Sequence, residues 1–140
     1  MSIYDKAISL IKIRPHFSVE LARKLSLRGF KSEDIKNVIN QLRDQGMLND
    51  DQFAQMYLDE LIRNKTFGFY GLKAKMMQRG IEGSEAERLL KEKLSYELER
   101  ELALKILDKS ANLPKQKIAQ RLSSKGFRSD TIRSVLQDFC

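Results

Sequence analysis

Residues 21–30 read LARKLSLRGF, and the same pattern returns as LKAKMMQRGI at 72–81 and as IAQRLSSKGF at 118–127. Each copy has two apolar residues four positions apart, then a basic residue, a glycine and a large apolar residue. A second apolar set follows each glycine: Ile35, Val38 and Ile39, then Ala86, Leu89 and Leu90, then Ile132, Val135 and Leu136. This spacing is typical of amphipathic helices. Units this small cannot bury their apolar faces alone, so we expect them to stack as a helical repeat protein.

The first unit is expected to contain three helices, preceded by a separate helix at about 2–14 that Pro15 ends. Ser18 is placed to cap the first helix of the unit, and Gly29 stands where a left-handed C-terminal cap is needed. The second helix starts at Ser32. The third follows Asn49, which has capping-box spacing to Gln52.

The second unit is expected to form helices at about 71–79, 84–95 and 96–109. Ser84 and Glu87 have the spacing of another capping box. No glycine or proline separates the last two helices, so the sequence also allows one long helix there. Strand-like alternation is absent. We therefore predict an all-α fold, an elongated curved array of tandem three-helix repeats: an N-terminal helix at 1–15, repeats at 16–65 and 66–112, and a repeat truncated to two helices at 113–140.

Composition excludes several classes of function. With 41% hydrophobic and 32% charged residues, the 140-residue chain is expected to be ordered. No apolar run reaches the roughly 18 residues that span a bilayer, and no signal peptide opens the chain, so we expect no membrane contact and a cytoplasmic location. One cysteine and one histidine provide no plausible metal set. No phosphate-binding glycine loop or nucleophile and base set is present, so we expect no catalytic residues and no cofactor.

The charge indicates an anionic partner. The net charge is +7, from 26 basic and 19 acidic residues, and the excess is segregated. No acid interrupts 63–79, which contains Arg63, Lys65, Lys73, Lys75 and Arg79. Asp130 is the single acid in 115–133, which contains Lys115, Lys117, Arg121, Lys125, Arg128 and Arg133.

A repeated pair of basic residues becomes visible when the repeats are aligned: Lys24 with Arg28, Lys75 with Arg79, and Arg121 with Lys125. Such pairs build an extended cationic surface, but cations in a last helical turn also complement the macrodipole by about 0.3 to 1 kcal/mol. The second explanation fits Arg28, Arg79 and Lys125 better than the residues one turn earlier. Both interpretations stay open. The candidate partner-binding set comprises these six residues with Arg63, Lys65, Lys73 and Lys117.

Two further features have alternative interpretations. Phe67, Phe69 and Tyr70, in a link flanked by glycines, are suited either to stacking on bases or to packing one repeat on the next. The helix-glycine-helix units also suggest helix-turn-helix DNA reading. In that motif the N-terminal residues of the second helix approach DNA, and here those positions hold acids, among them Glu33, Glu85 and Asp130. Like charge argues against this interpretation.

Three further segments are distinctive: RPHFSVELARKL at 14–25, GMLNDDQFA at 46–54, and GFYGL at 68–72 followed by QRGI at 78–81. They resemble, in that order, the first-repeat signature, the paired-acid, phenylalanine-alanine motif and the second-repeat signature of the RecX family, bacterial regulators of the RecA recombinase. The resemblance covers nearly the whole chain. In two departures, Phe69 stands in place of a proline, and Asn49 leaves the acidic pair at Asp50 and Asp51.

The resemblance implies a regulatory binding protein in homologous recombination, DNA repair and the SOS response that contacts more than one RecA protomer. It implies that the protein lodges in the groove of a RecA filament on single-stranded DNA and suppresses ATP hydrolysis and strand exchange, with direct contact to single-stranded DNA a further expectation. Separately, we expect the protein itself to be a monomer. The alternative from a different class is a helical protein that binds nucleic acid without sequence preference.

Overall fold

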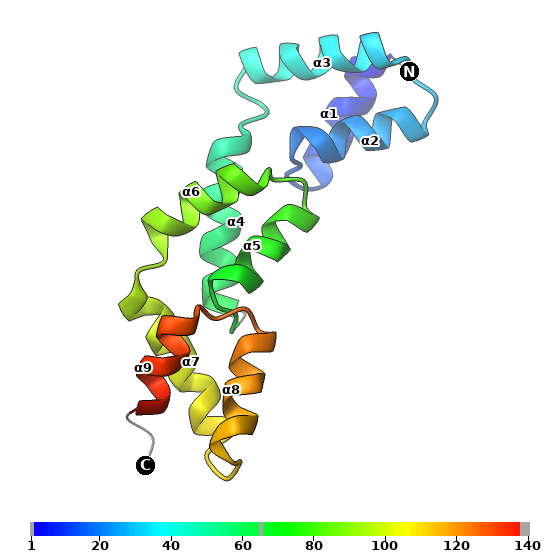
Figure 1. Ribbon diagram of the computed structural model, residues 1–140. Helices are drawn as coiled ribbons and strands as arrows, with labels where there is room; N and C mark the ends of the chain where they lie inside the picture. The colour runs from blue at the N-terminus through cyan, green and yellow to red at the C-terminus, as the bar shows by residue number, and fades with distance from the viewer. Residues whose placement is uncertain (1, 65, 138–140) are drawn as a thin grey trace. The chain divides into compact units, whose positions relative to one another are not determined.

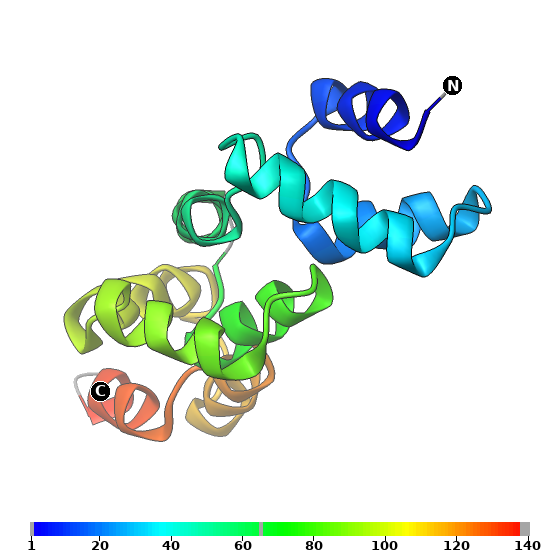
Figure 2. The ribbon, with the colours of Figure 1, turned by 90° about the horizontal axis from the view of Figure 1, so that it is seen from above.

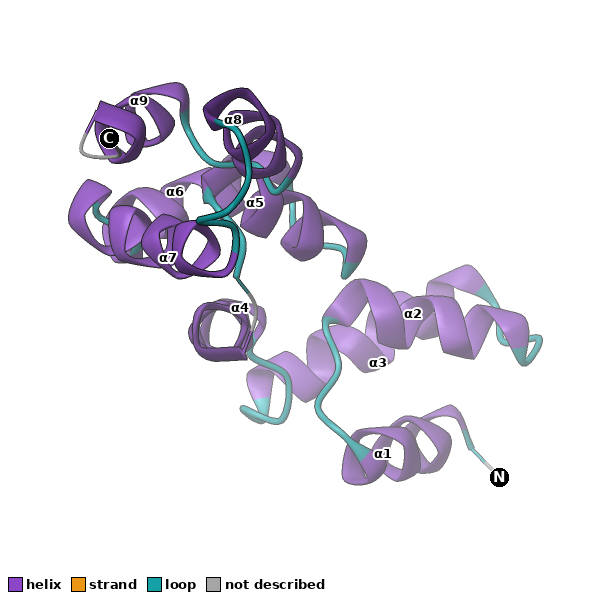
Figure 3. Cartoon of the chain, turned by 90° about the horizontal axis from the view of Figure 1, so that it is seen from below, coloured by secondary structure: helices purple, strands orange, loops and turns teal. Residues whose placement is uncertain are grey.

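The computed structural model describes residues 2–64 and 66–137, and every regular element in those ranges is an α-helix (Figure 1, Figure 3). The helices are α1 (Ile3–Ile13), α2 (Ser18–Leu27), α3 (Ser32–Asp44), α4 (Asp50–Asn64), α5 (Phe69–Gln78), α6 (Gly83–Lys93), α7 (Tyr96–Lys109), α8 (Lys115–Ser124) and α9 (Ser129–Gln137). The predicted all-α class is confirmed. No helix in the described ranges is both long and apolar enough to cross a membrane.

The chain divides into two compact units, Met1–Met56 and Tyr57–Cys140, and the division falls within α4. The expected boundaries after residues 15 and 112 lie in links between helices, and the boundary after residue 65 falls at a residue outside the described ranges. The assignment of these segments as repeat domains stays a prediction.

In the first unit, α1 packs against both α2 and α3, and α2 and α3 lie side by side (Figure 2). Their shared core includes Ala7, Leu21, Leu25 and Leu42, all completely buried. In the second unit, α5 packs against α6, whereas α8 and α9 both pack against α7.

The glycine caps repeat in detail. Gly29, Gly80 and Gly126 have φ angles of 88°, 100° and 83°, the left-handed region that glycine enters without a steric penalty. The residue after each glycine donates its backbone N–H to the carbonyl five positions earlier, on Leu25, Met76 and Leu122, at 3.3, 3.2 and 3.1 Å. These three apolar side chains are completely buried. The predicted register of the repeats is therefore confirmed.

Two predicted helix caps are wrong, and a third helix begins two residues before its approximate predicted start. Ser18 is the first residue of α2 and does not cap it; Phe17 occupies the cap position, and its N–H donates to Glu20 Oε1 at 3.0 Å. Ser84 lies inside α6, which begins one residue earlier than expected. Helix α5 begins at Phe69 because a carboxylate from α7 accepts the Phe69 N–H.

The start of α4 and the break between α6 and α7 can be compared with the capping and helix breaks expected from the sequence. The Gln52 N–H donates to Asn49 Oδ1 at 3.0 Å, as its spacing predicted. The chain between 84 and 109 forms two helices, because Ser95 leaves the helical conformation and its Oγ accepts the Leu98 N–H at 3.0 Å. A serine cap thus makes the break without glycine or proline.

Candidate partner-binding surface

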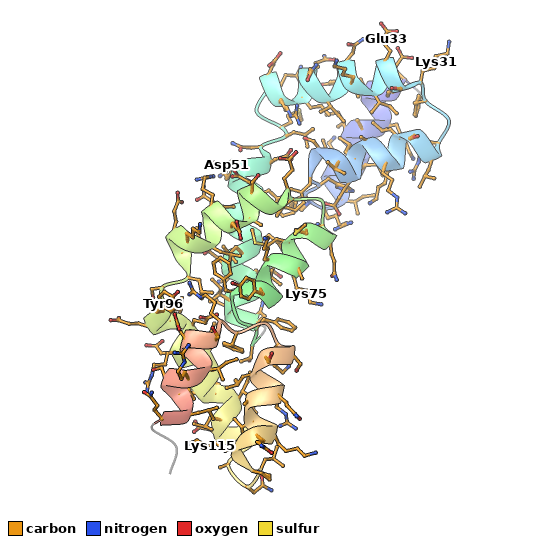
Figure 4. All side chains as sticks on the ribbon, viewed as in Figure 1. Lys31, Glu33, Asp51, Lys75, Tyr96 and Lys115 are labelled. Atoms are coloured by element: carbon orange, nitrogen blue, oxygen red, sulfur yellow. The ribbon has the colours of Figure 1, made fainter. Side chains whose placement is uncertain are left out.

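Phe67, in the link between α4 and α5, carries two lysine ammonium groups over its ring. Lys75 Nζ lies 5.4 Å from the ring centroid, and Lys125 Nζ lies 5.3 Å from it. Lys75 belongs to α5, where Figure 4 labels it, and Lys125 follows α8 as its C-terminal cap. A ring face attracts an ammonium group by about 0.5 to 1 kcal/mol at exposed sites. The ring thus holds together two like charges from successive repeats.

A hollow of about 320 Å³ opens beside this ring. Helix α7 contributes Lys105 and Lys109 to its wall, and Arg121 and Lys125 line it from the α8 side. No acidic side chain lines the hollow in the part of the chain that the structure describes. We call Phe67, Lys75, Lys105, Lys109, Arg121 and Lys125 the Phe67 cluster.

The hollow also contains a buried hydroxyl that positions one of its cations. Arg121 Nη1 donates to Ser110 Oγ at 2.7 Å, and Ser110 is completely buried. Lys105 and Lys109 are exposed and stand four positions apart on α7, where like charges cost about 0.2 to 0.5 kcal/mol. Lys109 lies in the last turn of α7 and complements the macrodipole there, but Lys105 lies before that turn. Helix stability alone therefore does not account for this concentration of charge.

The first-unit pair has a different environment. Lys24 is half-buried, and its Nζ lies 2.7 Å from Nε2 of His16, a buried residue. The other ring nitrogen lies 2.8 Å from the Arg14 carbonyl and must donate to it, so Nε2 accepts from the lysine. Burial lowers the pKa of His16 below its ordinary value, which favours this neutral ring. Arg28 is exposed, with its Nη1 3.3 Å from the Lys24 carbonyl.

The remaining predicted residues are dispersed. Lys73 forms an ion pair with Glu87 at 3.2 Å, and Arg79 lies over the Tyr57 ring, 4.9 Å from its centroid. Arg63 and Lys117 are exposed to solvent. Lys65 lies outside the described residues. Of the ten predicted residues, the structure brings Lys75, Arg121 and Lys125 together at the Phe67 cluster.

All six paired basic residues lie at the C-terminal ends of their helices, where a positive charge complements the helix macrodipole. Arg28, Arg79 and Lys125 are the C-terminal cap residues of their helices, and Lys24, Lys75 and Arg121 lie in the last turns. The distinction drawn between the two positions of each pair is therefore wrong, since both lie close to the negative end of a helix. What separates Arg121 and Lys125 from the others is that both line one hollow, and Lys75 joins them by lying over the Phe67 ring, which lines the same hollow.

The aromatic link packs the third repeat onto the second. Phe69 is buried, the Gly68 N–H donates to the Lys125 carbonyl at 3.0 Å, and the Tyr70 N–H donates to the Gly126 carbonyl at 2.8 Å. A Cβ on Gly68 would lie 2.3 Å from the Phe127 Cα, so the backbones approach too closely for any side chain. The packing interpretation holds for Phe69, whereas Tyr70 remains exposed.

Glu99 on α7 stabilises this contact between the second and third repeats, which we call the joint. Its side chain is completely buried and accepts the Phe69 N–H at 2.7 Å and the Arg128 N–H at 3.3 Å on Oε2. Oε1 accepts from Arg128 Nε at 2.9 Å and from the Thr131 hydroxyl. One carboxylate therefore binds the start of α5 and the segment that enters α9.

Arg128 completes the joint with aromatic contacts. Its guanidinium lies 3.8 Å from the Tyr96 ring centroid and 4.7 Å from that of Phe69, and it donates to the Leu94 carbonyl at 3.3 Å. Tyr96 starts α7, where Figure 4 labels it, and is exposed like Tyr70. In the sequence, Arg128 is visible only as one member of the basic segment 115–133.

Sequence reasoning missed Lys105, Lys109 and Glu99. The two lysines occupy a segment of mixed charge, and their four-residue spacing was the available signal. Glu99 stands three, four and seven positions before Leu102, Ala103 and Ile106, so helical spacing places it on the apolar face of α7, unlike Glu97 and Glu101. That spacing was the available signal for its burial, but its partners, which lie 29 to 32 positions away, leave no local signal.

Comparison with known proteins assigns the chain to a family. No protein-family model matches it. The regulatory protein RecX of Prosthecochloris aestuarii is 31% identical over 137 residues, which cover 96% of this chain and 91% of that protein. The chain belongs to the RecX family. The regulatory protein RecX of Pelodictyon phaeoclathratiforme is 32% identical over 136 residues, covering 94% of this chain and 84% of that protein.

Solved RecX structures share the fold. The crystal structure of RecX from Lactobacillus salivarius matches with a TM-score of 0.87 at 24% identity, covering 98% of this chain and 94% of that one. A second RecX crystal structure matches with a TM-score of 0.84 at 23% identity, over 97% of this chain and 72% of that one. At these identities the likeness concerns the fold, and it supports the tandem arrangement of helices expected from the sequence.

Proposed function

We propose that this RecX-family protein binds a RecA filament on single-stranded DNA and inhibits ATP hydrolysis and strand exchange, without catalysis of its own. The supporting observation is the Phe67 cluster, where cations from the second and third repeats converge on a hollow with no acidic residue among its described lining residues. A nucleoprotein filament presents the complementary negative charge. Membership of a family whose relatives are named regulatory proteins supports a regulatory role.

In this proposal the cluster acts mainly on association. Opposite potentials steer two partners together and raise the association rate, whereas closely packed contacts control dissociation. The backbone hydrogen bonds from Gly68 and Tyr70 hold the end of α8, and with it Lys125, beside the Phe67 ring over which Lys75 also lies, and Glu99 binds Arg128 just beyond it. The cationic surface is therefore formed before the partner arrives. A preformed surface avoids part of the ordering cost of binding.

The test is a titration of the protein into a reaction containing RecA, single-stranded DNA and ATP, with hydrolysis as the readout. The unmodified protein should inhibit in proportion to filament occupancy. The triple variant Lys75→Gln, Arg121→Gln and Lys125→Gln should inhibit less and associate more slowly at low salt. Its melting temperature should fall moderately, because Lys75 and Lys125 are half-buried over the Phe67 ring and Arg121 donates to the buried Ser110 hydroxyl. Inhibition is therefore compared at a temperature where both proteins are fully folded.

A matched control separates location from net charge. Lys31, Lys91 and Lys115 are exposed and lie outside the cluster, and their replacement by glutamine removes the same charge (Figure 4 labels Lys31 and Lys115). This control should inhibit as the unmodified protein does. If both triple variants lost the same inhibition, net charge alone would account for the effect of the cluster. Absence of inhibition by the unmodified protein at saturation would refute the proposed function.

The same hollow favours a second candidate, binding of single-stranded nucleic acid without sequence preference. If its four cations each neutralise one phosphate, log affinity should fall with log salt concentration with a slope of about −3. Affinity for the filament should depend less on salt, because protein contacts would contribute part of it. Equal slopes for bare strands and filament would favour this second candidate.

A further inference from the structure

A separate groove runs along α2 and α3 in the first unit, with a volume of about 570 Å³. Its lining includes Val19, Ala22 and Ser26 from α2 and Ser32, Ile35 and Ile39 from α3. On each helix these residues are spaced by three, four or seven, so they form one stripe per helix. The floor is aliphatic, and Val19 keeps 59% of its surface exposed.

Basic residues from both helices line the same groove. Arg23 of α2 and Lys36 of α3 are exposed, and neither forms an ion pair within the described ranges. Arg43 pairs with Asp50 at 3.6 Å, so its charge is partly neutralised. None of the described lining residues is acidic. The groove therefore combines an apolar floor with uncompensated positive charge.

The second repeat fills the corresponding groove with its own side chains. In the register set by the glycines, Ala22 and Lys36 correspond to Lys73 and Glu87, which form an ion pair at 3.2 Å. Ser26 corresponds to Met77, whose Cε would lie 3.5 Å from a Cβ on Gly83, the counterpart of Ser32. The first repeat has Ala22 in place of the lysine of the ion pair, Lys36 in place of its glutamate, and Ser26 in place of the methionine. Its groove is open because of these residues and not because of the fold.

The third repeat resembles the first in residue type but not in free charge. Ala119, Ser123 and Ser129 repeat the small residues, and Arg133 corresponds to Lys36. Asp130 pairs with Arg133 at 2.9 Å. The α2–α3 groove is thus distinguished by basic residues that have no internal partner within the described ranges.

Ser18 provides an independent observation at the same groove. It lines the groove at the start of α2 and is buried, and its Oγ has no hydrogen-bond partner among the described residues. A buried hydroxyl without a partner is costly, and a carbonyl or carboxylate brought by a ligand would supply one.

We propose that the α2–α3 groove docks an amphipathic helical segment of a partner protein, with a short apolar face flanked by acidic residues. Two stripes with helical spacing accommodate such a face, in the manner of a helix lying in a hydrophobic groove. Arg23 and Lys36 complement the flanking acids. A nucleic acid strand fits less well, because no aromatic ring lines the described groove to stack on a base. The inference does not depend on the proposed function.

The test uses the 140-residue chain and a labelled, acetylated peptide of about 15 residues, long enough to sample a helix. The peptide carries leucines at helical spacing on one face and glutamates beside them, and a second peptide has lysines in place of the glutamates. The acidic peptide should bind in fluorescence anisotropy and shift the methyl resonances of Val19, Ile35 and Ile39. The lysine peptide should do neither.

A closed variant, Ala22→Lys with Ser26→Met and Lys36→Glu, copies the residues that fill the second-repeat groove and should therefore fold. It should bind the acidic peptide about tenfold or more weakly, a loss of at least about 1.4 kcal/mol. Lys91→Gln changes the net charge by the same single unit and should bind normally.

Three results would overturn the proposal. Binding by the closed variant at unchanged affinity would place the peptide elsewhere. Unshifted methyl resonances at saturating acidic peptide would do the same, whether or not the variant folds. An oligodeoxythymidine that shifts these methyl signals when the acidic peptide does not would assign the groove to nucleic acid.

Discussion

Replacement of Glu99 by alanine should destabilise the second unit strongly. The carboxylate is completely buried and accepts four hydrogen bonds, two of them from backbone N–H groups. Its loss leaves Arg128, whose side chain is 15% exposed, without its counter-ion. Removal of one partner from a buried pair costs about 3 to 5 kcal/mol. Contacts of Arg128 with Tyr96 and the Leu94 carbonyl remain and oppose part of this loss.

Urea denaturation followed by circular dichroism measures the loss of unfolding free energy. In a thermal melt, the same loss should lower the melting temperature by roughly 10 to 15 °C. Glu101→Ala on the same helix is the control, because Glu101 is exposed and its loss should cost about 0.5 kcal/mol or less. The double variant Glu99→Ala with Arg128→Leu should lose less than the sum of the single variants, since no unpaired charge is left. A Glu99→Ala loss below about 1 kcal/mol would refute the assignment of Glu99 as the buried anchor of the joint.

Leu122→Ala should lower the free energy of unfolding by about 2 to 5 kcal/mol in urea, and a loss near zero would contradict the packing of the third repeat. Burial lowers the pKa of His16 below its ordinary value of 6.5, so the unfolded state binds the proton at a higher pH than the folded state does. The free energy of unfolding should therefore fall as the pH drops below about 6.5, and His16→Gln should make it depend less on pH. Gly126→Ala should lower the melting temperature measurably, because its Cβ would lie 2.0 Å from the Gly71 nitrogen and force the joint apart. Gly29→Ala, at a similar φ but in open space, should cost only about 1 kcal/mol, and equal losses at the two glycines would contradict this account.

Most of the fold could be predicted from the local spacing of apolar residues and glycines. The positions of Leu25, Met76 and Leu122 and the left-handed glycines followed from the sequence because each depends on contacts within one turn or one helix pair. Helix starts were less predictable. Ser18 has the right residue type for a cap, but Glu20 binds the Phe17 N–H and moves the start of the helix.

The candidate site was only partly predictable for the same reason. Lys75, Arg121 and Lys125 were selected by charge and register, but charge alone did not separate them from Lys73, which Glu87 neutralises. Lys105 reaches the hollow because α7 packs against α8, and that contact has no local signal in the sequence.

The hydrogen bonds of Glu99 imply an order of folding events. Each glycine cap closes a helix pair through bonds between residues five positions apart, so these pairs can form early and independently. The Glu99 bonds join residues 29 to 32 positions apart and must wait until a longer loop closes. We therefore expect the third helix pair to fold on its own before it docks. In native-state hydrogen exchange, the Phe69 and Arg128 amides should report undocking as a separate event.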